Sequence, residues 1–316
     1  MKILHGYKLA HRILNSPVLA IGVFDGVHIG HRRVIKKMMK SSLLGDKTIL
    51  TFDPHPETVL RPHKELPRIM SLEHRLRIFD QMGLDAAVVI RFSKYISGMS
   101  PEDFISKVIK RGLGAKRVFV GENFYFGKGA SADVIKFQQI GKERGVKVDI
   151  VNSLKTSGKT VSSTRVRELV SKGKIKEAGK LLGRSVSVLG TVVSGDGVGR
   201  TIGTPTANID PHHEVIPPVG VYAVKVFLKG KYLPGVLNIG YKPTFYGRSP
   251  KRKEPVIEAH IIGFKGDIYG KDIEVFFLKK LRREKRFKSH VELKRQIEKD
   301  ILAAKELMSN SDQGAK

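Results

Sequence analysis

Residues 20–31 read Ala-Ile-Gly-Val-Phe-Asp-Gly-Val-His-Ile-Gly-His. The apolar run Val18–Phe24 has the length of one buried strand, and the Asp-Gly pair at 25–26 breaks it. A helix that begins near His31 would direct unpaired N–H groups at an anion, and the imidazoles of His28 and His31 would add donors. Histidines near a turn are more often merely solvated, but the position directly after a strand favours a phosphate-binding site.

The chain from residue 18 to 151 alternates apolar strand candidates with amphipathic helix candidates, which indicates an α/β domain with a parallel sheet. Strands are predicted at Val18–Phe24, Thr48–Phe52, Ala86–Arg91, Arg117–Val120 and Val146–Val151. One intervening helix should begin after Ser100, where a capping serine, a proline and two acids follow one another, and should end near Gly112. Ligands of such sheets bind beyond the carboxyl ends of the strands, so the loops there should carry the chemistry.

Three of these loops are rich in groups that bind charged ligands. Residues 51–56 read Thr-Phe-Asp-Pro-His-Pro, and residues 121–127 read Gly-Glu-Asn-Phe-Tyr-Phe-Gly. Residues 162–167, Ser-Ser-Thr-Arg-Val-Arg, place hydroxyls and guanidinium groups just before a helix, which suits an anion at its amino end. An ordinary serine cap with solvated arginines would look the same, so this segment indicates function only together with residues 20–31.

The second half of the chain has a different pattern. Residues 162–183 are helical in pattern and end on a glycine, so we place a domain boundary there, with one domain at 1–183 and the other at 184–316. Residues 186–277 are rich in valine, isoleucine, aromatic residues and glycine turns, which predicts a compact antiparallel β-barrel. From Ser289 the spacing of apolar residues predicts one closing helix.

The composition limits the class of protein. With 316 residues, 41% of them hydrophobic, the chain can bury a substantial core. No run of apolar residues is long enough to span a membrane, and the first residues lack a secretory signal, so we expect a soluble cytoplasmic protein with no membrane partner. The absence of cysteine excludes disulfides, thiolate metal sites and cysteine nucleophiles.

The net charge of +28 suggests anionic partners. Both halves of the chain carry an excess of lysine and arginine, so the charge is not confined to one tail. Such a field would attract small molecules that carry phosphate groups. A lysine excess shared by the proteins of the source organism explains the charge better than a dedicated nucleic-acid surface. Binding of nucleic acid by the basic run at 279–295 stays an alternative that we do not favour.

Residues 20–31 resemble the nucleotidylyltransferase signature of the bacterial bifunctional riboflavin kinase/FAD synthetase family, Gly-x-Phe-Asp-Gly-Val-His-x-Gly-His. The matching positions are Gly22, Phe24, Asp25, Gly26, Val27, His28, Gly30 and His31. The loops at 51–56, 121–127 and 162–167 also look like nucleotide-site segments of that family. The resemblance implies a Rossmann-like nucleotidylyltransferase domain that transfers AMP from ATP to FMN and releases FAD and pyrophosphate.

The resemblance also implies roles for individual residues, with His28 and His31 catalytic. The residues implied to hold the ATP phosphates are Gly22, Phe24, Asp25, Gly26, His28, Gly30, His31, Ser162, Ser163, Thr164 and Arg167. Asp25 would orient a histidine or hold magnesium, and a plain Asp-Gly turn is an equal alternative. Asp53, His55 and Asn123 would lie on the flavin side. For Asp53 and His55, a rigid Pro-x-Pro turn is the competing interpretation.

A second signature lies in the other domain. Residues 199–208, Gly-Arg-Thr-Ile-Gly-Thr-Pro-Thr-Ala-Asn, are similar to the flavokinase signature of the same family, which implies that Thr206 and Asn208 bind magnesium. The residues implied to bind ATP or flavin in this domain are Gly199, Arg200, Thr206, Asn208 and Arg282. Hydroxyl and amide oxygens suit a magnesium ion that keeps several waters. Thr204 replaces the more usual phenylalanine, which affects local packing.

Glu258 is the expected catalytic base of the kinase. The ribityl hydroxyl of riboflavin is a poor nucleophile until a base accepts its proton. Glu258 alternates with apolar neighbours on a predicted strand, and its place resembles the Glu-x-His position of the family. A solvent-facing strand glutamate is the commoner reason for such a pattern, so only the family match favours catalysis.

These features predict a bifunctional enzyme that phosphorylates riboflavin to FMN and adenylylates FMN to FAD. ATP would be the co-substrate of both steps, Mg²⁺ the cofactor, and riboflavin, FMN and FAD the substrates and products. The expected partners are small molecules, and self-association is compatible with the sequence. Activity of only one half stays open as a second hypothesis, with the kinase the more vulnerable because of Thr204.

Overall fold

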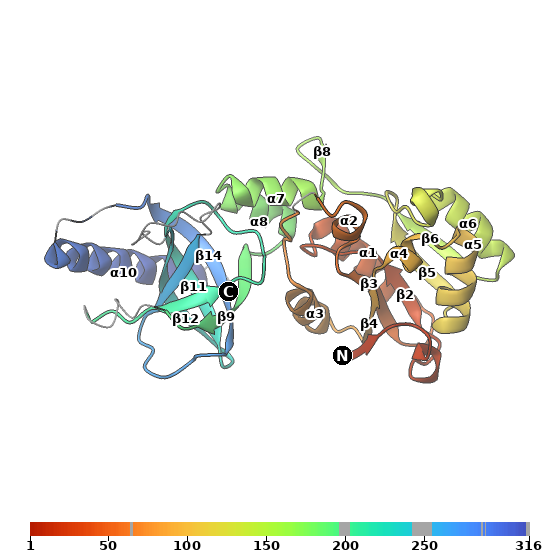
Figure 1. Cartoon of the computed structure of the whole chain (residues 1–316), viewed down its shortest axis with the longest axis horizontal. Helices are drawn as coiled ribbons and strands as arrows, with labels where there is room; N and C mark the ends of the chain where they lie inside the picture. The colour runs from red at the N-terminus through yellow and green to blue at the C-terminus, as the bar shows by residue number, and fades with distance from the viewer. Residues whose placement is uncertain (64–65, 196–202, 242–254, 286, 288, 314–316) are drawn as a thin grey trace. The chain divides into compact units, whose positions relative to one another are not determined.

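The computed structural model describes residues 1–63, 66–195, 203–241, 255–285, 287 and 289–313. The chain separates into two compact units (Figure 1). The first consists of Met1–Arg68 and Leu72–Arg165, and the second of Ile69–Ser71 and Val166–Lys316. The division into functional domains at 1–183 and 184–316, which we expect from the sequence, stays a prediction.

The first unit contains a six-stranded parallel sheet with the strand order β1-β4-β3-β2-β5-β6. The strands are β1 (Lys2–His5), β2 (Val18–Ile21), β3 (Lys47–Asp53), β4 (Ala86–Arg91), β5 (Arg117–Gly121) and β6 (Lys147–Val151). The predicted α/β class is confirmed. The sequence did not indicate β1, because this edge strand is mostly exposed and has no continuous apolar run. β2 is also shorter than predicted, because the backbone turns away from the sheet after Gly22 and reaches a left-handed φ of +56° at Phe24.

Helices lie on both sides of this sheet (Figure 1). They are η1 (Ala10–Arg12), α1 (Ile29–Met39), α2 (Pro56–Leu60), α3 (Leu72–Gln81), α4 (Lys94–Ser97), α5 (Pro101–Asp103), the π-helix η2 (Phe104–Gly112), η3 (Lys128–Ala130) and α6 (Val134–Glu143). The helix predicted after Ser100 begins there, because the Ser100 hydroxyl accepts a hydrogen bond from Asp103 N at 3.1 Å. It continues as η2 to Gly112, as predicted.

A short hairpin and two helices follow β6. They are β7 (Lys155–Thr156), β8 (Lys159–Thr160), α7 (Ser163–Ser171) and α8 (Ile175–Leu182). The single helical pattern at 162–183 is therefore two helices, because Gly173 has a φ of +72° that ends the first. The end at Gly183 is confirmed, since this glycine caps α8 in the left-handed conformation.

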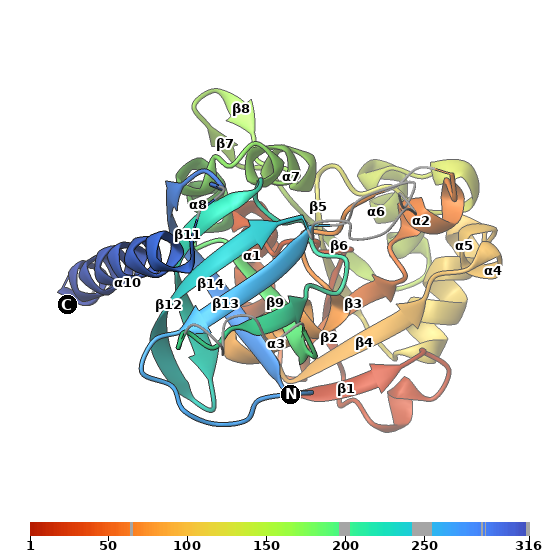
Figure 2. The ribbon, with the colours of Figure 1, turned by 60° about the vertical axis from the view of Figure 1, so that its left-hand side comes forward.

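The second unit is built on a closed antiparallel barrel with the strand order β10-β13-β12-β11-β14-β9. Its strands are β9 (Ser187–Val193), β10 (Ala207–Asp210), β11 (Gly220–Leu228), β12 (Lys231–Gly240), β13 (Val256–Ile261) and β14 (Asp272–Arg282). The predicted barrel and closing helix are confirmed, with α10 (His290–Gln313) beside the barrel (Figure 2). Val221, Val236 and Ala304 form a buried cluster between α10 and the strands.

A buried ion pair also joins α10 to the barrel. The Arg282 guanidinium donates to Asp300 through Nε at 3.0 Å and through Nη2 at 2.9 Å. Gln296 donates to the other Asp300 oxygen at 3.0 Å. Because Asp300 is buried, removing its charge would leave the arginine without its counter-ion in a poorly solvated place.

We therefore expect Asp300→Asn to destabilise the second unit by about 3 kcal/mol, a typical cost of breaking a buried pair. Urea unfolding of the full chain, followed by circular dichroism, would measure the shift. Glu298→Gln is the matched control, because Glu298 is exposed on the same helix. A midpoint for Asp300→Asn equal to that of the control would contradict a stabilising role of the pair.

Candidate functional site

The predicted phosphate-binding turn leaves the sheet at the end of β2. The last backbone hydrogen bond from this segment to β3 joins Gly22 N to Leu50 O at 3.1 Å. Phe24 and Val27 then adopt φ values of +56° and +39°, which are rare for bulky or β-branched residues. A Cβ on Gly22 would lie 3.1 Å from the Phe24 ring, so the glycine allows the ring to close over the backbone. The tight turn brings His28 to the start of α1.

Two histidines lie together at the amino end of α1. His28 is the N-cap, and its Nδ1 accepts a hydrogen bond from His31 N at 3.2 Å. The two rings stack with centroids 3.6 Å apart. Because Nδ1 of His28 is an acceptor, the proton of the neutral ring is on Nε2, which makes this atom a donor. A Cβ on Gly30 would lie 3.1 Å from the His28 ring, so this glycine gives the ring its space.

The serine-rich loop at 162–164 contacts the same turn. Ser163 Oγ donates to the carbonyl of Asp25 at 2.8 Å, and Ser162 Oγ accepts from Arg165 N at 3.3 Å. The Ser163 hydroxyl therefore stabilises the turn. Ser162 caps α7, which is also what the alternative of an ordinary serine cap predicts. Thr164 is exposed. Arg167 belongs to the second unit, and its predicted role at the phosphates stays a prediction.

Arg32 and Arg75 were not predicted, and both bind the turn. Arg32 Nε donates to Val27 O at 3.3 Å, and burial lowers the pKa of this guanidinium. Arg75 Nη1 donates to Val23 O at 2.6 Å. An arginine within an amphipathic helix pattern is normally interpreted as a surface residue. The sequence pattern therefore did not indicate either contact.

The predicted flavin-side residues lie at or just after the ends of β3 and β5, the two neighbours of β2 in the sheet. At the end of β3, Asp53 Oδ1 lies 3.5 Å from Arg75 Nη2. His55 Nδ1 accepts from Glu57 N at 3.2 Å and so caps α2. Asn123 follows β5 and is exposed. Because β3, β2 and β5 are parallel neighbours, the predicted loops meet at one edge of the sheet.

In the second unit, three polar residues form a row across the barrel. Asn208 of β10 pairs with Glu258 of β13, which pairs on its other side with Asn238 of β12. Directly opposite residues of neighbouring strands point to the same face. Their neighbours Ile257 and Ile239 are buried in the barrel, so the row lies on the outer face. Asn238 was not among the predicted site residues, because strand register is not visible in one sequence.

The segment before Asn208 is held by contacts that position it. His260 Nδ1 lies 2.8 Å from Pro205 O, which joins β13 to the residues next to Thr206. A Cβ on Gly195 would overlap the side-chain amide of Asn208. Gly195 therefore leaves the space in which the Asn208 amide lies. The Thr204 hydroxyl is buried, and among the described residues it has no hydrogen-bond partner.

A cavity of about 320 Å³ lies next to Thr206. Apolar and aromatic side chains form much of its wall, and Lys265 and Asp267 add charges. Its lining includes Pro205, Thr206, Ala207, Phe264, Ile268 and Tyr269. A partly aromatic cavity beside a hydroxyl group suits a flat base joined to phosphates.

The other predicted kinase residues divide into two groups. Arg282 has its guanidinium bound to Asp300 and to the carbonyl of Arg283, at 3.2 Å. Gly199 and Arg200 lie outside the described residues. Within the described ranges, no group of three or more histidine, aspartate or glutamate side chains converges as a metal cage. Thr206 and Asn208 nevertheless offer the oxygen donors that suit magnesium shared with a nucleotide.

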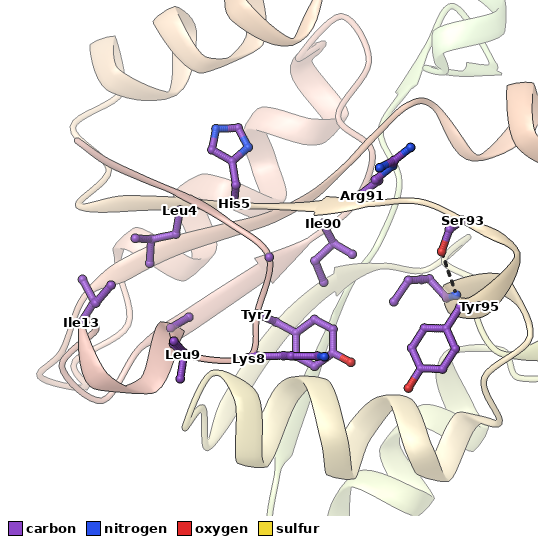
Figure 3. Close-up of a pocket in the computed structure, with 13 residues that line it drawn as sticks. Leu4, His5, Tyr7, Lys8, Leu9, Ile13, Ile90, Arg91, Ser93 and Tyr95 are labelled. Atoms are coloured by element: carbon purple, nitrogen blue, oxygen red, sulfur yellow. Dashed lines mark hydrogen bonds between the residues drawn. The ribbon is translucent and has the colours of Figure 1, made fainter.

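A larger cavity of about 490 Å³ in the first unit lies apart from the predicted residues (Figure 3). It follows the ends of β1 and β4, and its lining includes His5, Tyr7, Arg91 and Tyr95. Burial raises the pKa of Tyr7, and the neighbouring Tyr95 raises it further through its charge and a hydrogen bond. None of the residues predicted for adenylylation is among those that line this cavity.

Two family models match the chain. Residues 11–165 match the model described as FAD synthetase, and residues 182–308 match the model described as riboflavin kinase. The bifunctional riboflavin kinase/FMN adenylyltransferase of Escherichia coli K12 is 36% identical, with 97% of each chain covered. The protein of the same name from Bacillus subtilis is 35% identical, with 98% of each chain covered.

A solved structure shares the fold over nearly the whole length. It is described as a macrolide-efflux protein from Streptococcus pneumoniae and is 27% identical, with a TM-score of 0.80 over 96% of this chain and 99% of that one. In the described part of this chain, no helix has the length and apolar character needed to cross a membrane. Identity and coverage over almost the full length place this chain in the family of bifunctional riboflavin kinase/FMN adenylyltransferases.

Proposed function

We propose that the chain makes FAD from riboflavin in two ATP-dependent steps at separate sites. The second unit phosphorylates riboflavin to FMN, and the first adenylylates FMN to FAD with release of pyrophosphate. The observation that carries the assignment is the presence of two different polar centres. One is a helix end with stacked histidines, and the other is a strand row with a carboxylate.

The first unit handles a nucleophile that is already charged. An oxygen of the FMN phosphate attacks the α-phosphorus of ATP, and the bond from this phosphorus to the pyrophosphate oxygen breaks. No base is needed, so the site must position the two phosphates and stabilise the charge. His28 Nε2 and the N–H groups of the first turn of α1 are the donors that we assign to the ATP phosphates.

The second unit must activate a hydroxyl group. We assign to Glu258 the acceptance of the proton from the terminal ribityl hydroxyl, whose oxygen then attacks the γ-phosphorus while ADP leaves. Glu258 lies between Asn208 and Asn238 in the strand row, which supports this role. We assign Thr206 and Asn208 to the magnesium ion, which would neutralise the phosphate charge. The cavity beside Thr206 is the proposed place of the adenine base.

We place this activity in the cytoplasm, with small molecules as the partners. The alternative of nucleic-acid binding rests on the charge of +28 and on the basic run at 279–295. Binding of a DNA duplex at micromolar concentration, with a steep loss as salt rises, would support that alternative. We expect no binding above background at physiological ionic strength.

Two single variants should separate the steps. Glu258→Gln should lower riboflavin phosphorylation by about 100-fold or more, because the base is lost, while added FMN is still converted to FAD. His28→Ala should instead let FMN accumulate, because a phosphate donor and the cap of α1 are lost. Chromatography of FMN and FAD over time measures both. The reverse pattern would mean that the two activities are assigned to the wrong units.

Gly195→Ala should impair only the kinase. The new methyl group would displace the Asn208 amide, and loss of a supporting contact at a metal site typically costs about 10- to 100-fold in affinity or activity. We expect a higher magnesium and ATP requirement for FMN formation, measured by titration of each. FAD formation from supplied FMN in the same preparation is the internal control. An unchanged magnesium dependence would show that Asn208 does not hold the metal.

A further inference from the structure

Arg75 is a buried arginine for which the two-step reaction above gives no role. It lies on α3 and is 3% exposed. Its Nη1 donates to Val23 O at 2.6 Å and to Thr51 Oγ1 at 3.0 Å. Both terminal nitrogens also lie 3.4 Å from Phe52 O. One guanidinium group therefore contacts the ends of two neighbouring strands.

These contacts begin where the strand ladder stops. Gly22 N donates to Leu50 O at 3.1 Å, and beyond this point the segment after β2 turns away from β3. Thr51 Oγ1 donates to Val23 O at 3.0 Å, so the hydroxyl and the guanidinium share one acceptor. Val23 directly precedes the left-handed Phe24, at φ +56°. Arg75 and Thr51 thus hold the first peptide of the phosphate-binding turn against β3.

The guanidinium group of Arg75 also interacts electrostatically with two predicted site residues, Asp25 and Asp53. Burial lowers the pKa of its guanidinium, and the carboxylates of Asp25 and Asp53 raise it. Asp53 Oδ1 lies 3.5 Å from Nη2. A buried cation is costly, and well-packed apolar residues often replace such charges without loss of stability. A role in geometry accounts for the arginine better than a role in stability.

We infer that Arg75 is a positioning residue for adenylyl transfer. Its guanidinium fixes the separation between the turn at 22–28, which carries His28, and the Asp53–His55 segment on the flavin side. This inference rests on the proposed assignment of these two loops to ATP and FMN. In-line attack requires the FMN phosphate and the α-phosphorus at near-contact distance, and a misplacement of about 1 Å can cost about 100-fold in rate. Loss of Arg75 should therefore lower kcat more than it raises either KM.

The test uses the full chain with Arg75→Lys and Arg75→Met. Lysine keeps the charge but lacks the planar fork that reaches Val23 O, Thr51 and Phe52 together. We expect kcat of adenylylation to fall by about 10- to 100-fold in both variants, with the KM for ATP and for FMN changed by less than about 3-fold. Arg117→Met is the matched control, because Arg117 has a two-point ion pair with Asp149 at the start of β5. It should leave kcat unchanged.

Thr51→Val provides a second test if the Arg75 variants do not fold. Valine keeps the shape of the buried side chain and removes only the hydroxyl that joins Arg75 to Val23 O. We expect kcat about 3- to 10-fold lower with both KM values unchanged. In the pair Arg75→Lys with Thr51→Val, the losses should not multiply, because both changes release the same peptide.

Several outcomes would overturn the inference. A kcat per folded molecule within about 2-fold of wild type, in Arg75→Lys or in Thr51→Val, would contradict positioning. A rise in KM at constant kcat would make Arg75 a ligand-binding group instead. If the wild-type chain forms no FAD from FMN and ATP, the proposed function fails and this inference with it. An active wild type with unaffected variants would refute the inference alone.

Discussion

The backbone between β2 and α1 must leave the sheet, reverse, and start a helix within a few residues. It does so through left-handed conformations at Phe24, Gly26 and Val27, two of which carry side chains that disfavour them. A turn with such unfavourable backbone angles is stable only where contacts with the surrounding structure hold it in place. Ser163 binds the carbonyl of Asp25, and Arg75 binds that of Val23. Side chains of the first unit therefore supply hydrogen-bond donors to the backbone carbonyl groups of this turn.

The two proposed sites bind phosphate groups in different ways. In the first, the nucleophile is already an anion, and the structure offers donors at a helix end rather than a base. In the second, the nucleophile is a hydroxyl group, and the strand register places the Glu258 carboxylate between two asparagines. The difference follows from the proton that must leave in one step and not in the other. Both steps use ATP, but they require different arrangements of side chains.

Local sequence patterns predicted most of the fold. Buried strands such as Ala86–Arg91 have continuous apolar runs, and Ser100 and Gly183 mark helix ends through capping chemistry. The edge strand Lys2–His5 lacks such a run because it is mostly exposed. The residues that were not predicted as site residues, Arg32, Arg75 and Asn238, acquire their places through packing and register. Neither property is local in sequence, so a pattern within one segment cannot show it.

In the proposed two-step reaction, one chain transfers two different phosphorus atoms of ATP to the same flavin. The decisive experiment incubates wild-type protein with riboflavin, Mg²⁺ and ATP that is labelled either at the γ- or at the α-phosphate. We predict γ-label first in FMN and then in FAD, and α-label in FAD but not in FMN. A flavin product without γ-label, or α-label in FMN, would contradict the account, as would the absence of any labelled flavin.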